Sequence, residues 1–343
     1  MLEHDFASRR WRDPAWRAEA LGWVDEQLAE LGVLRAGAPE QLHAHAWSTV
    51  LRVPTDAGPF WFKANALGTA HEGPLLTALT QWAPDHVLQP LAVDPRRGWL
   101  LLPDGGVTLR AAHDGRTDVA HWRNILVDHG TLQRDLAQHA DELVALGVPD
   151  VRPERLAGIR AELLDDTAAL RLGRPEGLSQ EQLVQLRADS SRYAVLSNEL
   201  AATGIPATLQ HDDLHDNNVF LPERPGGHYR VFDWGDASVA HPFAVLLVAL
   251  RVVADRHQLS YGDPELLRLR DAYIEPWTAD HDRSTLLHAC DLALRASGVS
   301  RALSYRSALL EGAPDDHDAC GDAVPGWLLE LYEPHPLDSA GWP

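Results

Sequence analysis

The sequence predicts an α+β protein with two parts, a small strand-rich part over residues 1–105 and a larger, mainly helical part over residues 106–343. Two observations give this division. Apolar runs broken by proline, glycine and aspartate fill the first hundred residues, which is the pattern of short strands joined by tight turns. After Gly105 and Gly106 the apolar side chains recur at helical spacing instead. The chain of 343 residues is long enough for two substantial cores.

The strand-rich part is expected to begin with a helix and to continue with two hairpins. Residues 14–33 (PAWRAEALGWVDEQLAELGV) have the apolar spacing of an amphipathic helix. Residues 46–66 (AWSTVLRVPTDAGPFWFKANA) predict two strands joined by a turn that contains proline and glycine. A helix is expected over residues 69–82, where Pro74 lies near the start and costs little. Residues 87–106 predict two more strands.

The longer part is helical by pattern and holds one predicted hairpin. Helix-period segments dominate residues 118–204, and the chain is again helical from residue 241 to about residue 312. Between them, residues 217–234 (NNVFLPERPGGHYRVFDW) contain two short apolar runs separated by proline and glycine, which predicts a hairpin.

Charge and composition restrict the partners. The chain has 30 Lys and Arg residues against 50 Asp and Glu residues, so its formal net charge is −20. No basic stripe is present, so a nucleic acid is not an expected partner, whereas a cationic small molecule is compatible with this charge. No apolar stretch is long enough for a membrane helix, the N-terminus has no signal-peptide pattern, and the two cysteines form no disulfide or zinc pattern. We therefore expect a cytoplasmic protein without a membrane partner, whose oligomeric state the sequence does not fix.

The densest group of polar side chains lies in residues 210–221 (QHDDLHDNNVFL), and Asp233 follows fifteen residues after Asn218. Two interpretations compete. In the first, His211 and His215 share a helical face with a neighbouring aspartate and bind a transition metal for hydrolysis. The paired asparagines and the apolar VF after them favour a loop that runs into a strand, which weakens this interpretation.

The second interpretation takes His211, Asp213 and Asn218 as the pattern H-x-D-x-x-x-x-N, followed by a hairpin and Asp233. This pattern resembles the catalytic loop and the metal-binding aspartate of the protein-kinase-like fold, in the variant of aminoglycoside phosphotransferases and choline kinases. The order of elements is similar over about residues 40–250. The resemblance implies a bilobal protein-kinase-like fold, with a nucleotide-binding N-lobe over residues 1–105 and a helical C-lobe over residues 106–343 that carries the catalytic loop and the acceptor site.

The resemblance also assigns roles to residues. Asp213 would orient the acceptor hydroxyl and take its proton. Asn218 and Asp233 would bind Mg²⁺, which prefers hard oxygen donors. His211 would brace the loop through hydrogen bonds. ATP is the implied phosphate donor, although GTP stays open.

Lys63 is the only lysine in the chain, beside 29 arginines. The resemblance places it at the α- and β-phosphates of ATP, held by an ion pair with Glu72. A compact ammonium enters a narrow slot between phosphate oxygens that a planar guanidinium does not enter in the same way. Ser48 either donates a hydrogen bond to a phosphate or is a buried structural hydroxyl.

Departures from protein kinases favour a small-molecule kinase. The glycine-rich loop is absent, and no A-P-E-like segment follows Asp233. Asp212 stands where the family has a small residue, and its charge could raise the proton affinity of Asp213 or face solvent. His215 and Asp216 are expected to be exposed loop residues.

The expected acceptor is a small molecule with a hydroxyl group, such as an aminoglycoside, an amino sugar or another amine-bearing alcohol. The acidic segments at residues 273–282 and 311–322 either form an anionic pocket for it or are solvated loops. The candidate acceptor residues are Asp212, Asp236, Glu275, Trp277, Asp315 and Asp316. The alternative class is a nucleotide-binding scaffold of the same fold that regulates without catalysis.

Overall fold

The computed structural model describes residues 6–224 and 226–338. The chain forms two compact units. The first contains the residues through Gly106 together with Phe232–Gly235 and Arg306–Cys320, and the second contains Val107–Val231, Asp236–Tyr305 and the residues from Gly321 onward. Two short segments from late in the sequence therefore belong to the first unit, and one of them carries Asp233.

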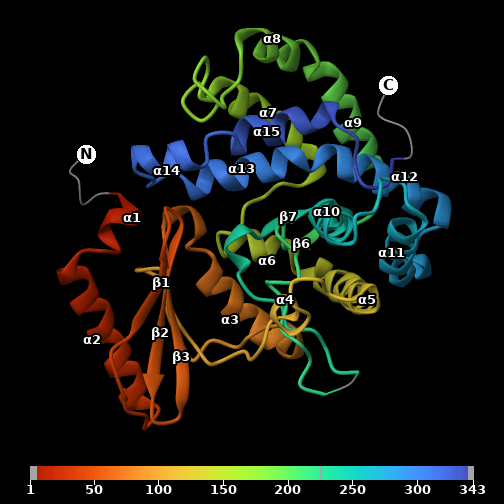
Figure 1. The fold of residues 1–343 in the computed structure, drawn as a ribbon. Helices are drawn as coiled ribbons and strands as arrows, with labels where there is room; N and C mark the ends of the chain where they lie inside the picture. Colours follow the sequence, from red (N-terminus) through yellow and green to blue (C-terminus); the bar gives the residue numbers. More distant parts are fainter. Residues whose placement is uncertain (1–5, 225, 339–343) are drawn as a thin grey trace. The chain divides into compact units, whose positions relative to one another are not determined.

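The first unit is built on a five-stranded antiparallel sheet with the strand order β1-β2-β3-β5-β4. Its strands are β1 (Glu40–Ala44), β2 (Ser48–Thr55), β3 (Gly58–Asn65), β4 (Ala92–Asp94) and β5 (Trp99–Leu102). Strands β1, β2 and β3 of this sheet are labelled in Figure 1. Both predicted hairpins are confirmed, as β2 with β3 and β4 with β5. Strand β1 was not predicted, because EQLHA has neither an apolar run nor a turn signal that separates it from its surroundings.

The two faces of this sheet are covered differently. Leu51, Phe62 and Leu101 lie on one face and form a core with Val24 and Leu28 of the predicted helix, which is α2 (Pro14–Glu30). The side chains of successive strand residues alternate between faces, so Lys63 points to the opposite face from Phe62. Lys63 is thereby directed away from the apolar core.

Helix α3 (Glu72–Trp82) packs on the face of the sheet that carries Lys63. A Cβ atom added to Gly73 would lie 2.9 Å from Val93 Cγ1 of β4, so the glycine permits the close approach of helix and sheet. The helix begins at Glu72, three residues later than predicted, because Leu67–Thr69 form a short 3-10 helix before it. This start places Glu72 in the first turn, on the side of the sheet where Lys63 lies.

The second unit is mainly helical. Its longest helices are α5 (Val119–Leu136), α7 (Pro153–Asp165), α9 (Ser190–Ala202), α10 (Leu246–His257), α11 (Pro264–Ile274) and α12 (Arg283–Ala296). Helix α13 (Gly298–Ala308) follows α12, and α15 (Ala323–Leu329) lies near the end of the chain. None of the helices within the described ranges is both long and apolar enough to span a membrane.

The predicted hairpin over residues 217–234 forms in reduced extent, without two full strands. Among its described residues, the antiparallel bridge between Val219 and Val231 joins the two arms, and the N–H of Phe220 donates to the carbonyl oxygen of Arg230 at 3.0 Å. The ordered pair is instead β6 (Thr208–Gln210) with β7 (Ser238–Ala240), which lies just outside the predicted hairpin at both ends. Pro222 lacks an N–H group and cannot donate to a ladder, so the intervening segment does not extend the pairing.

Strand β6 is fixed by side chains of the helices around it, and the loop with Asp213 starts directly after it. Gln133 of α5 donates from Nε2 to the carbonyl oxygen of Leu209 at 2.9 Å. Thr208 Oγ1 donates to the carbonyl oxygen of Gln133 at 2.6 Å, and Tyr273 Oη donates to Gln133 Oε1 at 2.5 Å. These groups are buried, so their bonds hold the start of the loop firmly.

Candidate active site

Lys63 forms the centre of a buried ion-pair cluster in the first unit. Its Nζ atom lies 2.6 Å from Glu72 Oε2 and 2.5 Å from Asp233 Oδ1. The residue is 7% exposed. Burial alone would lower the pKa of Lys63, but the carboxylates of Asp233 and Glu72 outweigh it and raise the pKa. The side chain of Lys63 is therefore protonated and positively charged at neutral pH.

Glu72 is held by two further donors besides Lys63. Asn65 Nδ2 donates to Glu72 Oε2 at 2.8 Å, and the backbone N–H of Trp234 donates to Glu72 Oε1 at 3.0 Å. Burial raises the pKa of Glu72, while Lys63 and Asn65 oppose this shift. The bond from Trp234 ties the segment of Asp233 to helix α3 within the first unit.

Asp233 stands in a backbone conformation that few non-glycine residues adopt. Its φ angle is 64°, in the left-handed region. Aspartate tolerates this region better than most residues. Its side chain remains 50% exposed although one oxygen binds Lys63, so the carboxylate keeps access to a ligand. The structure thus brings Lys63, Glu72 and Asp233 together: the ion pair of Lys63 with Glu72 was expected, and the contact of Lys63 with Asp233 was not.

The end of β1 and the turn that leads to β2 carry three stacked rings. The rings of His43 and His45 have centroids 4.7 Å apart, and those of His45 and Trp47 are also 4.7 Å apart. Ser48 is buried, and its Oγ atom lies 3.5 Å from His43 Nε2. His43 pairs with Val50 and Val50 pairs with Lys63, so His43 and Lys63 share one face of the sheet. Burial, helped by His45 and Lys63, lowers the pKa of His43 to about 4.

The loop with Asp213 is irregular in the second unit. Residues 211–218 form no helix, so His211 and His215 do not share a helical face as the metal-hydrolase interpretation required. His211 is fully buried, and its carbonyl oxygen accepts a hydrogen bond from the N–H of Asp213 at 2.7 Å. Asp212 has a φ angle of 58°, which turns the chain sharply between these two residues.

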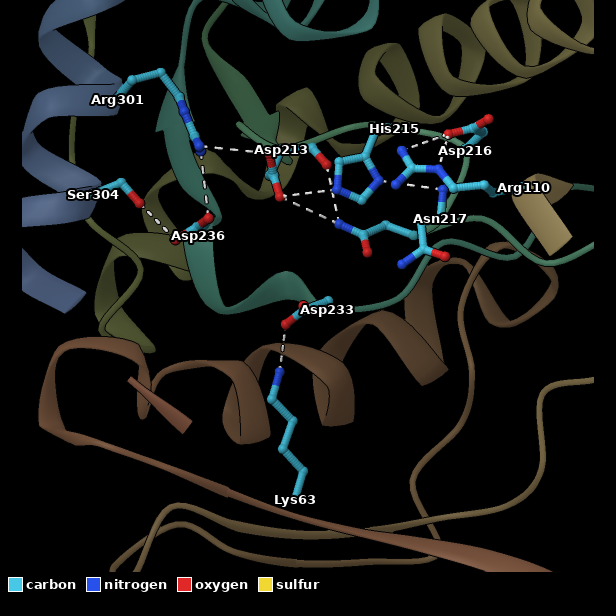
Figure 2. Close-up of polar contacts among 11 residues, drawn as sticks. Lys63, Arg110, Asp213, His215, Asp216, Asn217, Asp233, Asp236, Arg301 and Ser304 are labelled. Atoms are coloured by element: carbon cyan, nitrogen blue, oxygen red, sulfur yellow. Dashed lines mark hydrogen bonds and ion pairs between the residues drawn. The ribbon is translucent and has the colours of Figure 1, made fainter. Parts of the chain in front are cut away.

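Both carboxylate oxygens of Asp213 face hydrogen-bond donors (Figure 2). Arg301 Nη2 lies 3.5 Å from Oδ1, His215 Nε2 lies 3.4 Å from Oδ2, and Asn218 Nδ2 lies 3.5 Å from Oδ2. Burial alone would raise the pKa of Asp213, but the hydrogen bond from His215 and the charge of Arg301 outweigh it and lower the pKa. Asp213 is therefore a carboxylate at neutral pH.

His215 and Asp216 are not the exposed loop residues that the sequence suggested. His215 Nδ1 accepts a hydrogen bond from the N–H of Asn217 at 3.2 Å, so the ring proton lies on Nε2, which faces Asp213. Asp216 is fully buried and accepts hydrogen bonds from Arg110 Nε and Thr117 Oγ1, both at 2.8 Å. The charge of Arg110 makes this burial of Asp216 tolerable.

Arg301 and Ser304 of α13 are functional candidates that the sequence did not indicate. Arg301 Nη1 lies 3.4 Å from Asp236 Oδ2, and Ser304 Oγ donates to Asp236 Oδ1 at 2.6 Å (Figure 2). Asp236, a predicted acceptor residue, is thus brought beside Asp213 through Arg301. One arginine among 29 on a helix-period segment carries no signal of its own.

Asp212 is buried within the second unit and is held there by two serines. Its Oδ2 atom accepts hydrogen bonds from Ser238 Oγ at 2.9 Å and from Ser300 Oγ at 2.6 Å. The residue is 4% exposed, and burial raises the pKa of Asp212 to about 6. Asp212 does not face solvent, which was one of the two expectations for it.

The other candidate acceptor residues lie in different places. In the second unit, Glu275 is exposed, whereas Trp277 is 1% exposed and packs edge-to-face on Phe243 at 5.6 Å. Asp315 and Asp316 belong to the first unit. Asp315 lies 3.6 Å from Arg9, and Asp316 accepts a hydrogen bond from the N–H of Ala313 at 2.8 Å. Asp213, by comparison, belongs to the second unit.

No family model and no curated protein matches this sequence. Solved structures do match its fold. APH(2")-IIia, solved as a complex with GDP and kanamycin, has a TM-score of 0.59 and 15% identity, with 90% of this chain and 98% of that chain covered. The macrolide 2'-phosphotransferase MphH from Brachybacterium faecium has a TM-score of 0.56 and 17% identity, with 91% and 98% covered. The choline kinase LicA from Streptococcus pneumoniae has a TM-score of 0.55 and 14% identity, with 90% and 98% covered.

These similarities establish the fold. The chain has the bilobal α+β, protein-kinase-like fold that aminoglycoside phosphotransferases, macrolide phosphotransferases and choline kinases share. The identities of 14 to 17% are too low to carry an activity from those proteins to this one. A fold of this kind supports many activities, so the function depends on the residues around Lys63 and around Asp213.

Proposed function

We propose that this protein is an ATP- and Mg²⁺-dependent O-phosphotransferase that acts on a hydroxyl group of a small, amine-bearing alcohol such as an aminoglycoside or an amino sugar. The observation that carries the proposal is the cluster of Lys63 with Glu72 and Asp233. The only lysine of the chain is buried between two carboxylates that come from distant parts of the sequence.

Phosphoryl transfer requires mainly positioning and charge neutralisation from the protein. Lys63 provides a fixed positive charge for the phosphates of the nucleotide, and Glu72 holds that charge in place. In the second unit, Asp213 orients the hydroxyl group of the acceptor. Its lowered pKa makes Asp213 a weak base, which suits a reaction in which the hydroxyl proton leaves late, as bond formation to phosphorus proceeds.

Asn218 of the second unit and Asp233 of the first each offer a side chain whose chemistry fits Mg²⁺. The amide nitrogen of Asn218 faces the carbonyl oxygen of Asp213 at 3.2 Å, which directs the nitrogen inward and reserves the amide oxygen for a cation. Asp233 adds a half-exposed carboxylate. Both are hard oxygen donors, the type that Mg²⁺ prefers. When bound, the ion would neutralise charge on the phosphates.

Charge favours a cationic acceptor. Asp212, Asp213 and Asp236 gather in the second unit with Arg301 as the one arginine in their cluster, and the whole chain carries a formal net charge of −20. An amine on the acceptor would be attracted to such surroundings. The competing proposal of a non-catalytic scaffold is weaker, because the positions for the base, the lysine, its glutamate and the metal ligands are all filled.

The proposal is tested by ADP release with Mg²⁺ and a panel of aminoglycosides, amino sugars, choline-like alcohols and macrolides. We expect Asp213→Asn to lower the turnover with an accepted substrate on the order of 1,000-fold, while ATP still binds. Asp255→Asn, at an exposed helix position of the second unit, serves as the control and should keep full turnover. Undiminished turnover of Asp213→Asn would exclude Asp213 as the base. Tight ATP binding without ADP release on any acceptor would favour the scaffold.

A further inference from the structure

Arg301 is a buried cation that binds two acids of the second unit at once. Its side chain is 5% exposed, and it lies 3.5 Å from Asp213 and 3.4 Å from Asp236. It comes from α13, within the stretch of the sequence in which no motif is found. A guanidinium group presents donors in a fixed fork, so it can hold two carboxylates in a defined relation where an ammonium holds them less well.

The partners of Arg301 are themselves fixed. Ser304, one turn further along α13, donates to Asp236 Oδ1 at 2.6 Å, which leaves Oδ2 toward Arg301. The guanidinium also lies over the rings of Tyr305 and Trp327, at 5.3 and 5.4 Å from their centroids. Contacts with aromatic faces and an anchored carboxylate restrict a long side chain that would otherwise sample many rotamers.

The bonds of Arg301 to the two carboxylates are looser than an optimal salt bridge. Contacts of 3.4 and 3.5 Å exceed the distance of about 2.8 Å typical of charge-assisted hydrogen bonds. Nε of Arg301 also has no hydrogen-bond partner within the described part of the chain. Such an arrangement is a poor way to gain stability, since a buried pair stabilises only when its geometry is good. This points to a role other than stability.

We propose that Arg301 is the positioning residue of Asp213: it holds the Oδ1 side of the carboxylate, opposite the donors on Oδ2, and is itself fixed by Asp236 and Ser304. The orientation of Asp213 then rests on donors at both oxygens, and the acceptor hydroxyl meets a carboxylate in one conformation. This inference rests on the proposed phosphotransfer and adds to it a residue that determines turnover without contacting the nucleotide.

The chain offers a matched control in Arg295 of α12. Its side chain is 8% exposed, and Arg295 Nη2 lies 2.9 Å from Asp291 Oδ1 and 2.7 Å from Asp338 Oδ1. Arg295 is therefore an equally buried arginine between two carboxylates of the same unit, and neither of those belongs to the site. The variant Arg295→Met therefore shows how much stability and turnover change when a buried, ion-paired arginine outside the site is removed.

The test compares steady-state kinetics of Arg301→Met, Arg301→Lys and Arg295→Met. We expect Arg301→Met to lower kcat on the order of 100-fold, the effect of a misplaced catalytic group, with an unchanged KM for ATP. Arg301→Lys should keep a higher kcat than Arg301→Met. In a further variant, Arg301→Ala, guanidinium added to the solution should restore part of the lost kcat. Arg295→Met should lower the thermal stability and leave kcat unchanged. Equal kcat values for Arg301→Met and the wild type, or an effect confined to the acceptor KM, would overturn the proposal.

A milder variant and a structural measurement test the proposal even if Arg301→Met does not fold. If Arg301→Met does not fold, Ser304→Ala removes only the bond that anchors Asp236 and should still lower kcat several-fold; an unchanged kcat counts against the proposal. Crystal structures of the wild type and of Arg301→Lys provide a readout without turnover. If the lysine of Arg301→Lys contacts neither Asp213 nor Asp236 and Asp213 still keeps its wild-type conformation, the positioning role is overturned. This outcome does not depend on whether the protein is a phosphotransferase.

Discussion

The candidate site contains a buried cation between two carboxylates in each unit, Lys63 in the first and Arg301 in the second, but the two clusters differ in tightness. Lys63 of the first unit lies 2.5 and 2.6 Å from its partners, whereas Arg301 of the second lies 3.4 and 3.5 Å from its own. Glu72 is additionally held by Asn65 and Trp234, which completes the first cluster. The first is thus a tight assembly around a fixed charge, and the second is a looser frame around the carboxylate that we propose as the base.

The difference matches the two tasks of a phosphotransferase. A phosphate group needs a cation at a constant place, because binding and charge neutralisation depend on distance. An acceptor hydroxyl needs a carboxylate with an accessible oxygen, and overly strong bonds to that carboxylate would oppose proton transfer. Substitutions in either cluster test this difference.

The largest effect is expected from removing the tight cation. Lys63→Met leaves the buried carboxylate of Glu72 without its partner and should lower the free energy of unfolding by about 3 kcal/mol, the range for a broken buried ion pair. Urea unfolding followed by circular dichroism measures this. Glu72→Gln combined with Lys63→Met should recover part of the loss, because no charge is then left unpaired. Equal stability of Lys63→Met and the wild type would show that the first cluster is not tight.

The second effect concerns Asp212, which shares the surroundings of Arg301. The pKa of Asp212 is about 6 in the folded protein and about 3.9 in an unfolded chain. A raised pKa contributes stability below about pH 4 that is lost as the pH rises to about 6, and the difference of about two units corresponds to about 3 kcal/mol.

Asp212→Asn removes this dependence. Its unfolding free energy relative to the wild type should rise between pH 4 and pH 6 and stay level above pH 6. Urea unfolding at four pH values measures it, with Asp255→Asn, whose side chain is 81% exposed, as the control. If the difference in unfolding free energy between Asp212→Asn and the wild type does not change with pH, the pKa of Asp212 is not raised by its burial.

The smallest effect is expected at His215. Its hydrogen bond to Asp213 is long at 3.4 Å, so its loss in His215→Phe should cost about 1 kcal/mol, or about fivefold in kcat. His215→Gln retains a donor and should lie between this variant and the wild type. A loss in His215→Phe as large as that in Asp213→Asn would contradict this account, because His215 would then contribute to turnover as much as Asp213 does.

The sequence predicted the tight cluster better than the loose one, for a physical reason. Lys63 is unique in composition, and Glu72 follows it within nine positions, near the start of a predicted helix; in the loose cluster Asp213 has such a signal, through its spacing to Asn218, but Arg301 has none. The strands β2 to β5 could likewise be predicted, from their apolar runs and from the turn residues between them. Local constraints of this kind are visible in a linear sequence.

Arg301 follows no such constraint. It reaches Asp213 across 88 positions of the sequence, from a helix whose pattern fixes only which side is buried. The burial of Asp216 by Arg110 was missed likewise, because both contacts depend on tertiary packing. The hairpin over residues 217–234 was predicted with two short strands, whereas its described arms pair through the bridge between Val219 and Val231 and the bond from Phe220 to Arg230.

The central claim is that the two cations serve different partners, Lys63 the nucleotide and Arg301 the acceptor side. Calorimetric titration of ATP with Mg²⁺ into the wild type, Lys63→Arg and Arg301→Lys tests it directly. The bulkier guanidinium should not fit between carboxylates 2.5 and 2.6 Å from Lys63 Nζ, so we expect Lys63→Arg to weaken ATP binding about tenfold, or about 1.4 kcal/mol. Arg301→Lys should bind ATP as the wild type does. Unchanged ATP binding by Lys63→Arg, or a loss in Arg301→Lys as large as that in Lys63→Arg, would contradict the division.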